Sequence, residues 1–310
     1  MPKATRQLLK DTTPIKTSGI TNGLLNPEQA KKFLQQTFDA THLGSLVRHE
    51  MKTAKSGEVD KIGIAKRIIR EKTENVDDGY RGNVKTSVVK YACTAVRLPW
   101  EITEETLREN IEGQNFEKIV TDLMTTQLGI DLIDLYLNGD ESTESGDPDY
   151  DFLKINDGWV KQIENGGNIV DNANAALSLD MFYKMLQAVP DKYNNGKLRW
   201  LMSPHMKQNW ERVLYNAAKA NGSTLPEKFY EAPAGVQIET ETMFPESKIM
   251  LTDPKNLIVT NTYTMQIRKT TEGKEAIMQD KRFYVIHLDF DTIIEELEAT
   301  GMITNIKANL

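Results

Sequence analysis

The chain has little cysteine and no long apolar run. Its one cysteine, Cys93, excludes a disulfide within the chain, which fits folding inside a cell. Cys93 lies in a strand-like run, where we expect a small buried residue. No run of about 18 apolar residues could cross a bilayer, and the first residues lack the apolar core of a signal peptide. We therefore expect no membrane partner.

The motifs of common enzyme classes are also missing. No GxGxxG follows a strand, and no GxxxxGK[ST], HExxH, GxSxG or CxxC occurs. Four histidines and one cysteine leave little material for a nucleophile and its base. We expect no catalytic residues, no cofactor and no metal.

Charge gives no footprint for nucleic-acid recognition. The net charge is -7, so the surface would repel DNA. A small basic cluster is interleaved with acids, which favours protein contacts over phosphate contacts. The basic residues are Lys66, Arg67, Arg70 and Lys72, and the acids are Glu71, Glu74, Asp77 and Asp78.

One group of residues has a ligand-like arrangement. Strand alternation would place His287, Asp289 and Asp291 on one face, where a metal ion could bind them. We favour an ordinary sheet with one polar, solvated face, because the apolar residues on the other face explain the pattern alone. The tryptophans at 159, 200 and 210 are likewise interpreted as core residues.

The dominant element is a helix predicted over 103–138. Apolar residues recur there at three- and four-residue steps, without proline. Either Thr103 or Thr106 can cap its start, and Asn138-Gly139 ends it before an acidic loop over 140–149. The alternative is two helices joined near Gly113 or Gly129.

Before this helix, the pattern is an arm followed by strands. Residues 1–26 lack a sustained period, and Asn26-Pro27 then opens a short helix with Phe33, Leu34 and Phe38 on one side. Strands are predicted over 46–51 and 84–102. Between them, the charged segment 61–83 is interpreted as a long hairpin-like loop with too few apolar residues for a core of its own.

After it, helices and then strands are predicted. A helix over 179–189 and another from Ser203-Pro204 flank a strand over 197–202. The last third is expected to be mostly strands, with a glycine-containing turn and a brief acidic turn of helix. The strands span 249–251, 257–259, 263–268, 283–290 and 302–306, the glycine turn 270–274 and the helical turn 292–298.

Several short segments, taken in order, resemble the major capsid protein of tailed bacteriophages, with the Hong Kong 97-type fold. The joint order over most of the chain carries the resemblance, because each string alone is common. The segments are the arm, the charged loop, Leu98-Pro99-Trp100-Glu101-Ile102-Thr103, the long helix ending in Leu137-Asn138-Gly139-Asp140, Asp157-Gly158-Trp159, Trp200-Leu201-Met202-Ser203-Pro204, Met243-Phe244-Pro245-Glu246, residues 249–257, Phe283-Tyr284-Val285, and Asp289, Asp291 and Ile294-Glu295-Glu296.

The resemblance implies an α+β fold with an N-terminal arm, an extended loop, a peripheral domain with a long spine helix, and an axial domain. The arm would be 1–26 and the peripheral domain 27–144, with the extended loop near 52–95 and the spine helix near 103–138. The axial domain would be 145–250, and 251–310 would hold strands that return to the peripheral domain.

The resemblance also implies a structural role without catalysis. Such proteins form hexamers and pentamers that close an icosahedral head around packaged double-stranded DNA. The thin charged loop fits this role because it needs a neighbouring subunit, and an acidic lining would not trap DNA. The expected location is the virion, after assembly in the cytoplasm of a host bacterium.

Further partners follow from the same resemblance. A fused scaffolding domain is longer than the arm 1–26, so we expect a separate scaffolding protein, with a portal and decoration proteins. Lys61, Lys66 and Lys72 are candidates for the isopeptide crosslinks that some relatives form, but nothing marks a partner and no crosslinking is expected. The alternatives are an encapsulin shell protein, and a soluble enzyme that uses His287, Asp289 and Asp291.

Overall fold

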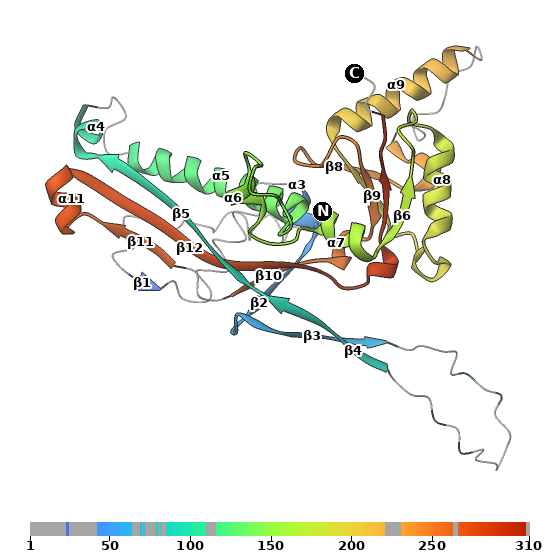
Figure 1. Ribbon diagram of the computed structural model, residues 1–310, viewed down its shortest axis with the longest axis horizontal. Helices are drawn as coiled ribbons and strands as arrows, with labels where there is room; N and C mark the ends of the chain where they lie inside the picture. Colours follow the sequence, from blue (N-terminus) through green and yellow to red (C-terminus); the bar gives the residue numbers. More distant parts are fainter. Residues whose placement is uncertain are drawn as a thin grey trace, which may run out of the picture.

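The computed structural model describes residues 23–24, 42–63, 69, 71, 79, 81, 85–109, 116–220, 231–262 and 266–307. Figure 1 shows an elongated molecule: a long sheet with a helix along it, a compact α/β body at one end, and a projecting hairpin. None of the described helices is long and apolar enough to cross a membrane.

A six-stranded sheet, called here the peripheral sheet, is built around β12 (Lys281–Ile294). Strand β5 (Thr94–Thr103) pairs along one side of β12. On the other side, β11 (Gln266–Thr270) and β10 (Leu257–Thr262) pair with successive parts of β12. Strand β1 (Gly23–Leu24) borders β11, and β2 (Arg48–Lys52) borders β10 in parallel.

Helix α5 (Phe116–Asn138) lies along this sheet (Figure 1). Its last three turns are buried against alternating residues of β5 and β12, as strand periodicity requires. Trp100 and Tyr284 stack with ring centroids 5.2 Å apart, and Tyr136 meets Phe290 edge-on at 5.1 Å. Aromatic packing therefore fixes the helix on one face of the sheet.

The predicted long helix is divided in the structure. Thr103 ends β5, α4 (Glu104–Glu109) follows, and α5 starts at Phe116. The cap at Thr103 is confirmed, because its Oγ1 accepts a hydrogen bond from the Thr106 amide at 3.3 Å. Residues 110–115, with the proposed junction at Gly113, lie outside the described residues, whereas Gly129 lies inside α5 without breaking it.

The second body, called here the axial body, is a five-stranded sheet in the order β6-β13-β9-β7-β8. Helices α7, α8 and α9 pack on it, and the predicted helices beginning near 179 and 204 are confirmed. The bounds are Asn168–Asp171 for β6, Gly301–Thr304 for β13, Ile249–Thr252 for β9, Arg199–Met202 for β7, Ile238–Thr240 for β8, Trp159–Gly166 for α7, Leu179–Ala188 for α8 and Pro204–Ala220 for α9.

The core of the axial body is aromatic. Phe182 of α8 meets Trp200 and Trp210 edge-on, each with ring centroids 4.9 Å apart, and all three side chains are fully buried. Trp159 is fully buried in the core beneath α5. The interpretation of the three tryptophans as core residues is thus confirmed.

The last third of the chain divides between the two bodies. Strands β10, β11 and β12 belong to the peripheral sheet, whereas β13 inserts between β6 and β9 of the axial body. The predicted helical turn over 292–298 is wrong at its start: β12 continues to Ile294, and only Leu297–Ala299 (η6) forms a 3-10 turn. Pairing of Ile293 and Ile294 with β10 explains the longer strand.

Short elements complete the described chain. One of them, α6, follows α5 after the predicted acidic loop 140–149, which consists of turns. The short elements are α3 (His42–Leu46), α6 (Tyr150–Leu153), η3 (Asp191–Tyr193), η4 (Pro233–Gly235), η5 (Pro254–Asn256) and α11 (Lys274–Gln279).

Strands β3 (Ser56–Gly63) and β4 (Lys85–Ala92) form the projecting hairpin, in register from Ser56↔Ala92 to Gly63↔Lys85. The predicted hairpin-like segment 61–83 lies mostly outside the described residues. The strand predicted over 84–102 is divided at Cys93 into β4, which belongs to the hairpin, and β5, which belongs to the peripheral sheet. Figure 1 shows the hairpin leaving the sheet near β2 and pointing away from both bodies.

Candidate functional site

The hairpin is fixed at its root by a small apolar cluster. Val59 and Tyr91 of the hairpin pack on Ile258 of β10 and Ile293 of β12. Gly57 is needed there, because a Cβ at this position would lie 2.7 Å from the Tyr91 hydroxyl oxygen. The root thus belongs to the peripheral sheet, while the strands beyond it project.

Polar contacts reinforce the same root. The Lys61 ammonium lies 2.6 Å from a Glu296 carboxylate oxygen and donates to the Glu295 carbonyl at 3.1 Å. The Ala92 amide donates to the Asp291 carboxylate at 2.7 Å. Charge-assisted contacts of this kind are shorter and stronger than neutral ones, so they define the hairpin's direction.

Two residues of the proposed ligand set, Asp289 and Asp291, lie at the hairpin root. Asp289 is buried, lies 3.2 Å from Lys55 Nζ and accepts a hydrogen bond from the Thr262 hydroxyl at 3.0 Å. His287 pairs in register with Arg97 and lies further along β12. No group of three metal-ligating side chains is found among the described residues. The expectation of a solvated polar face is wrong at Asp289 and Asp291, because chain beside the hairpin covers it.

Burial changes the proton affinity of this root. Burial raises the pKa of Asp291, against hydrogen bonds from the Ala92 and Thr292 amides. Burial, together with the charges of Asp291 and Asp289, raises the pKa of the Cys93 thiol to about 12. Cys93 is half-buried and protonated at neutral pH, so it is a packing residue rather than a nucleophile.

A second polar cluster joins α4 and α5 to the other end of β12, and we call it the tip clamp. Arg282 binds Glu104 of α4 and, at 2.9 Å, Glu117 of α5. Lys269 of β11 also binds Glu117. Burial raises the pKa of Glu117, but hydrogen bonds from Lys269 and Tyr284 and the charges of Lys269 and Arg282 outweigh it, so the net pKa is lowered.

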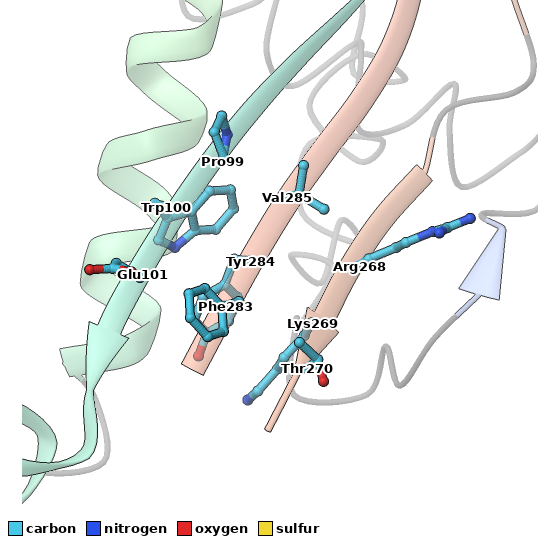
Figure 2. A pocket seen from close by; sticks show the side chains of 9 residues that line it. All are labelled: Pro99, Trp100, Glu101, Arg268, Lys269, Thr270, Phe283, Tyr284 and Val285. Atoms are coloured by element: carbon cyan, nitrogen blue, oxygen red, sulfur yellow. The ribbon is translucent and has the colours of Figure 1, made fainter. Parts of the chain in front are cut away.

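A hollow of about 570 Å³ lies across β5, β12 and β11. Figure 2 shows the lining side chains on three neighbouring strands, with β1 beside Arg268. Pro99 is exposed, and Phe283 and Val285 are half-buried. The hollow therefore presents apolar surface to the outside of the described chain.

Other exposed apolar side chains lie on helices of the same end. Leu123 of α5 is 64% exposed and Ile119, one turn before it, is 40% exposed. On α11, Ile277 is 68% and Met278 79% exposed. Large apolar side chains gathered at one end of a protein are typical of contact surfaces.

The lysines proposed for crosslinking are only partly placed. Lys61 is held in its ion pair with Glu296. Lys66 and Lys72, with the rest of the basic cluster, lie outside the described residues.

Sequence reasoning missed the tip clamp, because its partners are more than 150 residues apart and no local pattern links them.

Comparisons with known proteins agree with this geometry. No family model matches the chain. A protein of Bacillus subtilis (strain 168), YqbE, described as a prophage capsid protein, is 26% identical over 301 residues, which span 92% of this chain and 93% of that protein.

Solved structures show the fold. The procapsid of satellite phage P4 with its size determination protein matches 99% of this chain and 98% of its own, with a TM-score of 0.69 at 14% identity. The capsid of an empty GTA particle matches 99% of each chain, with a TM-score of 0.60 at 9% identity. The SrpI encapsulin of Synechococcus elongatus PCC 7942 matches 100% of this chain and 97% of its own, with a TM-score of 0.53 at 13% identity.

The chain therefore has the α+β, Hong Kong 97-type fold, and the resemblance to phage capsid proteins is confirmed.

Proposed function

We propose that this chain, which has the Hong Kong 97-type fold, is the major capsid protein of a tailed double-stranded DNA phage. The observation that carries the proposal is the extent of the match: a protein described as a capsid protein aligns over 93% of its length. The similarity to a capsid protein thus extends over nearly the whole chain, which supports a structural rather than a catalytic role. Its place is the virion.

The unit of assembly is a second copy of the same chain. Subunits join as hexamers and pentamers, with axial bodies toward the capsomer centre and peripheral sheets toward the rim. The projecting hairpin supports this arrangement, because its root is held by Lys61 and Asp291 while its strands leave both bodies. Such a hairpin gains packing only from a neighbour.

Other partners complete the head. A separate scaffolding protein guides closure, a portal occupies one vertex, decoration proteins bind outside, and packaged double-stranded DNA fills the shell after assembly in the host cytoplasm. The net charge of -7 supports an inner surface that does not hold DNA. The proposed domains are 1–26, 27–144, 145–250 and 251–310, except that β13 of the last segment belongs to the axial body, where it pairs with β6 and β9.

The first test is the mass of the purified chain by light scattering, followed by electron microscopy. We expect megadalton rings, tubes or shells, with correctly sized closed shells only when scaffold is added. A 35 kDa monomer that stays monomeric with scaffold would overturn the proposal. Closed, correctly sized shells from the chain alone would overturn the separate scaffold.

Denaturation of such particles tests crosslinking. A band of monomer size after boiling in denaturant is expected, because no crosslinking partner for Lys61, Lys66 or Lys72 is marked. A ladder of covalent oligomers would contradict this expectation.

The encapsulin alternative is favoured by one observation, the match to the SrpI shell over the full chain. The contents of purified particles distinguish the two functions. Packaged DNA with tail proteins supports the phage head, whereas an enclosed enzyme without DNA supports the encapsulin.

The soluble-enzyme alternative rests on His287, Asp289 and Asp291. Asp289 and Asp291 are engaged by Lys55 and the Ala92 amide, so they serve the hairpin root instead. Replacing all three residues is expected to change the stability of the hairpin root, and to abolish no catalytic activity.

A further inference from the structure

Asparagine followed by glycine recurs in the described part of the chain, and such a pair can rearrange chemically. The backbone nitrogen of the glycine can attack the side-chain carbonyl carbon of the asparagine, because glycine has no Cβ to block the approach. The reaction requires a backbone that lets the two groups meet, so the pairs should not react equally. The described pairs are Asn138-Gly139, Asn165-Gly166 and Asn195-Gly196.

The first pair, at the end of α5, is held by hydrogen bonds. The side-chain nitrogen of Asn138 donates to Asp134 Oδ1 and to the Met243 carbonyl, each at 2.7 Å. The Gly139 amide donates to the Leu135 carbonyl at 3.0 Å. Both reacting groups are therefore engaged elsewhere, and neither is free to turn toward the other.

The second pair, Asn165-Gly166, is exposed but helical. These two residues end α7, so the Gly166 amide takes part in the hydrogen bonds of its last turn. In a helix, the side chain of Asn165 points back toward the helix N-terminus, away from the amide that follows it. The pair is thus accessible to water but lacks the geometry for attack.

The third pair lies in the exposed turn between η3 and β7, and its geometry favours attack. Asn195 Oδ1 accepts a hydrogen bond from the Lys197 amide at 3.1 Å, which folds the side-chain carbonyl back over the peptide bond to Gly196. Gly196 has a φ of 82°, and a Cβ there would meet nothing within 4 Å. Within the part of the chain that the structure describes, the Gly196 amide donates no backbone hydrogen bond. Its nitrogen is therefore open to the side-chain carbonyl.

We propose that Asn195 is a site of spontaneous deamidation through a cyclic imide. The Gly196 amide loses its proton to a base and its nitrogen bonds to Asn195 Cγ. The bond between Cγ and Nδ2 breaks, and the nitrogen takes up a proton and leaves as ammonia. Water then opens the ring at either carbonyl, which gives aspartate or the β-linked isoaspartate. No atom is oxidised or reduced.

Either product changes an exposed turn beside β7 of the axial body. Both replace a neutral amide by a carboxylate, in a turn flanked by Lys192 and Lys197. Isoaspartate also adds a methylene to the backbone shortly before β7 begins at Arg199. The inference is independent of the proposed shell function, so its failure leaves that function standing.

Timed incubation of dispersed subunits in mildly alkaline buffer tests the site. Mass spectrometry of tryptic peptides should show conversion of amide to acid several-fold faster at Asn195 than at Asn165 or Asn138. Isoaspartyl methyltransferase, which methylates isoaspartate but not aspartate, should label the Asn195 peptide. In urea the three pairs lose their backbone differences and should react at similar rates.

Three results would overturn the proposal. The first is equal conversion of the three pairs in the folded chain, or none at Asn195. The second is conversion of Asn195 to aspartate without isoaspartate, which would indicate direct hydrolysis instead of ring formation. The third is a preference for Asn195 that persists in urea, because local sequence rather than the turn would then set the rate.

A matched pair of glycine variants tests the attacking atom. Gly196→Ala places a Cβ beside the reacting nitrogen and should slow conversion of Asn195 several-fold. Gly235→Ala is the control, because Gly235 also has a φ of 82° and open surroundings but follows Ala234. It introduces similar backbone strain and should leave conversion of Asn195 unchanged. Equal rates in the two variants would overturn the role of the Gly196 nitrogen.

Discussion

The axial body and the peripheral sheet are stabilised in different ways. In the axial body, Phe182, Trp200 and Trp210 meet inside a closed core, with helices packed on the sheet. In the peripheral sheet, α5 covers one face, the hollow lies on the other, and ion pairs hold its two ends. Among the described residues, the axial body encloses its apolar core, whereas the peripheral sheet leaves apolar side chains exposed.

This difference suits a shell subunit. A closed core gives the axial body one shape in every subunit. The tip clamp positions α4 and α5, and the ion pair of Lys61 positions the hairpin. The peripheral sheet keeps exposed apolar surface that suits contacts with a neighbour. Changes to the two bodies should therefore differ in size and in their dependence on pH.

The largest effect is expected in the axial core. Phe182→Ala should lower the free energy of unfolding of dispersed subunits by about 3–5 kcal/mol, because a fully buried ring between two indoles leaves a cavity. Urea denaturation followed by tryptophan fluorescence measures it. The matched control, Tyr183→Ala, removes a neighbouring ring that is 48% exposed and should change stability little. Equal effects of the two variants would contradict the closed core.

The tip clamp comes next. Arg282→Met should cost about 2 kcal/mol, because it leaves Glu104 and Glu117 without the guanidinium that pairs with both. Thermal or urea unfolding of dispersed subunits measures the loss. The control is Lys154→Met, which removes an exposed pair with Asp151 and should have no measurable effect. An unchanged free energy of unfolding in the Arg282→Met variant would show that aromatic packing alone holds α5 on the sheet.

Acidification should separate the two ends of β12. The pKa of Glu117 is lowered in the fold, so its stabilisation is present above its ordinary pKa of 4.5 and is lost as the pH falls through the lower folded value. The pKa of Asp291 is raised, so the cost of its buried charge is relieved as the pH falls toward its ordinary pKa of 3.8.

The two variants should therefore show opposite slopes. Relative to the unmodified chain, Glu117→Gln should gain stability as the pH falls below 4.5, and Asp291→Asn should lose stability between pH 7 and about 4. Urea unfolding of dispersed subunits across this range measures both. If the stability of both variants, relative to the unmodified chain, changed in the same direction with pH, the two ends of β12 would not be electrostatically distinct.

The smallest effect is expected at the hairpin root. Lys61→Met removes a partly exposed ion pair with Glu296 and should cost less than about 1 kcal/mol. Hydrogen exchange of residues 56–63 should nevertheless increase, because Lys61 also holds the Glu295 carbonyl. Lys184→Met, which breaks an exposed pair with Asp180 within α8 of the axial body, should leave that exchange unchanged. Equal exchange in both variants would mean that apolar packing alone sets the root.

Much of the fold could be predicted where the signal is local. Helical spacing and the Asn138-Gly139 stop identified α5, and Ser203-Pro204 identified the start of α9. Alternation identified the middle of β12 but not its extension to Ile294, because pairing with β10 outweighs the weak helical preference of that acidic stretch. The fold family came from the order of many short segments.

The contact surfaces could not be predicted in the same way. Asp289 and Asp291 looked like residues of a solvated face, yet residues near Lys55 and Ala92, about 200 positions earlier, cover them. Glu104 directly follows the predicted cap residue Thr103, and no local pattern links it to Arg282, which binds it from a distant strand. Pairings at such sequence separation leave no periodic trace, so only the folded chain reveals them.

The hairpin and the long strand of the sheet form one continuous piece of chain. Only Cys93 separates β4 from β5, and β5 pairs with β12 from Thr94 to Thr103 before leading into α4. A force that pulls on the hairpin therefore acts along the axis of β5. The hydrogen bonds between β5 and β12 resist such a force together, rather than breaking one after another. A movement of the hairpin is therefore transmitted through β5 to α4, at the other end of the peripheral sheet, with no loop between β4 and β5.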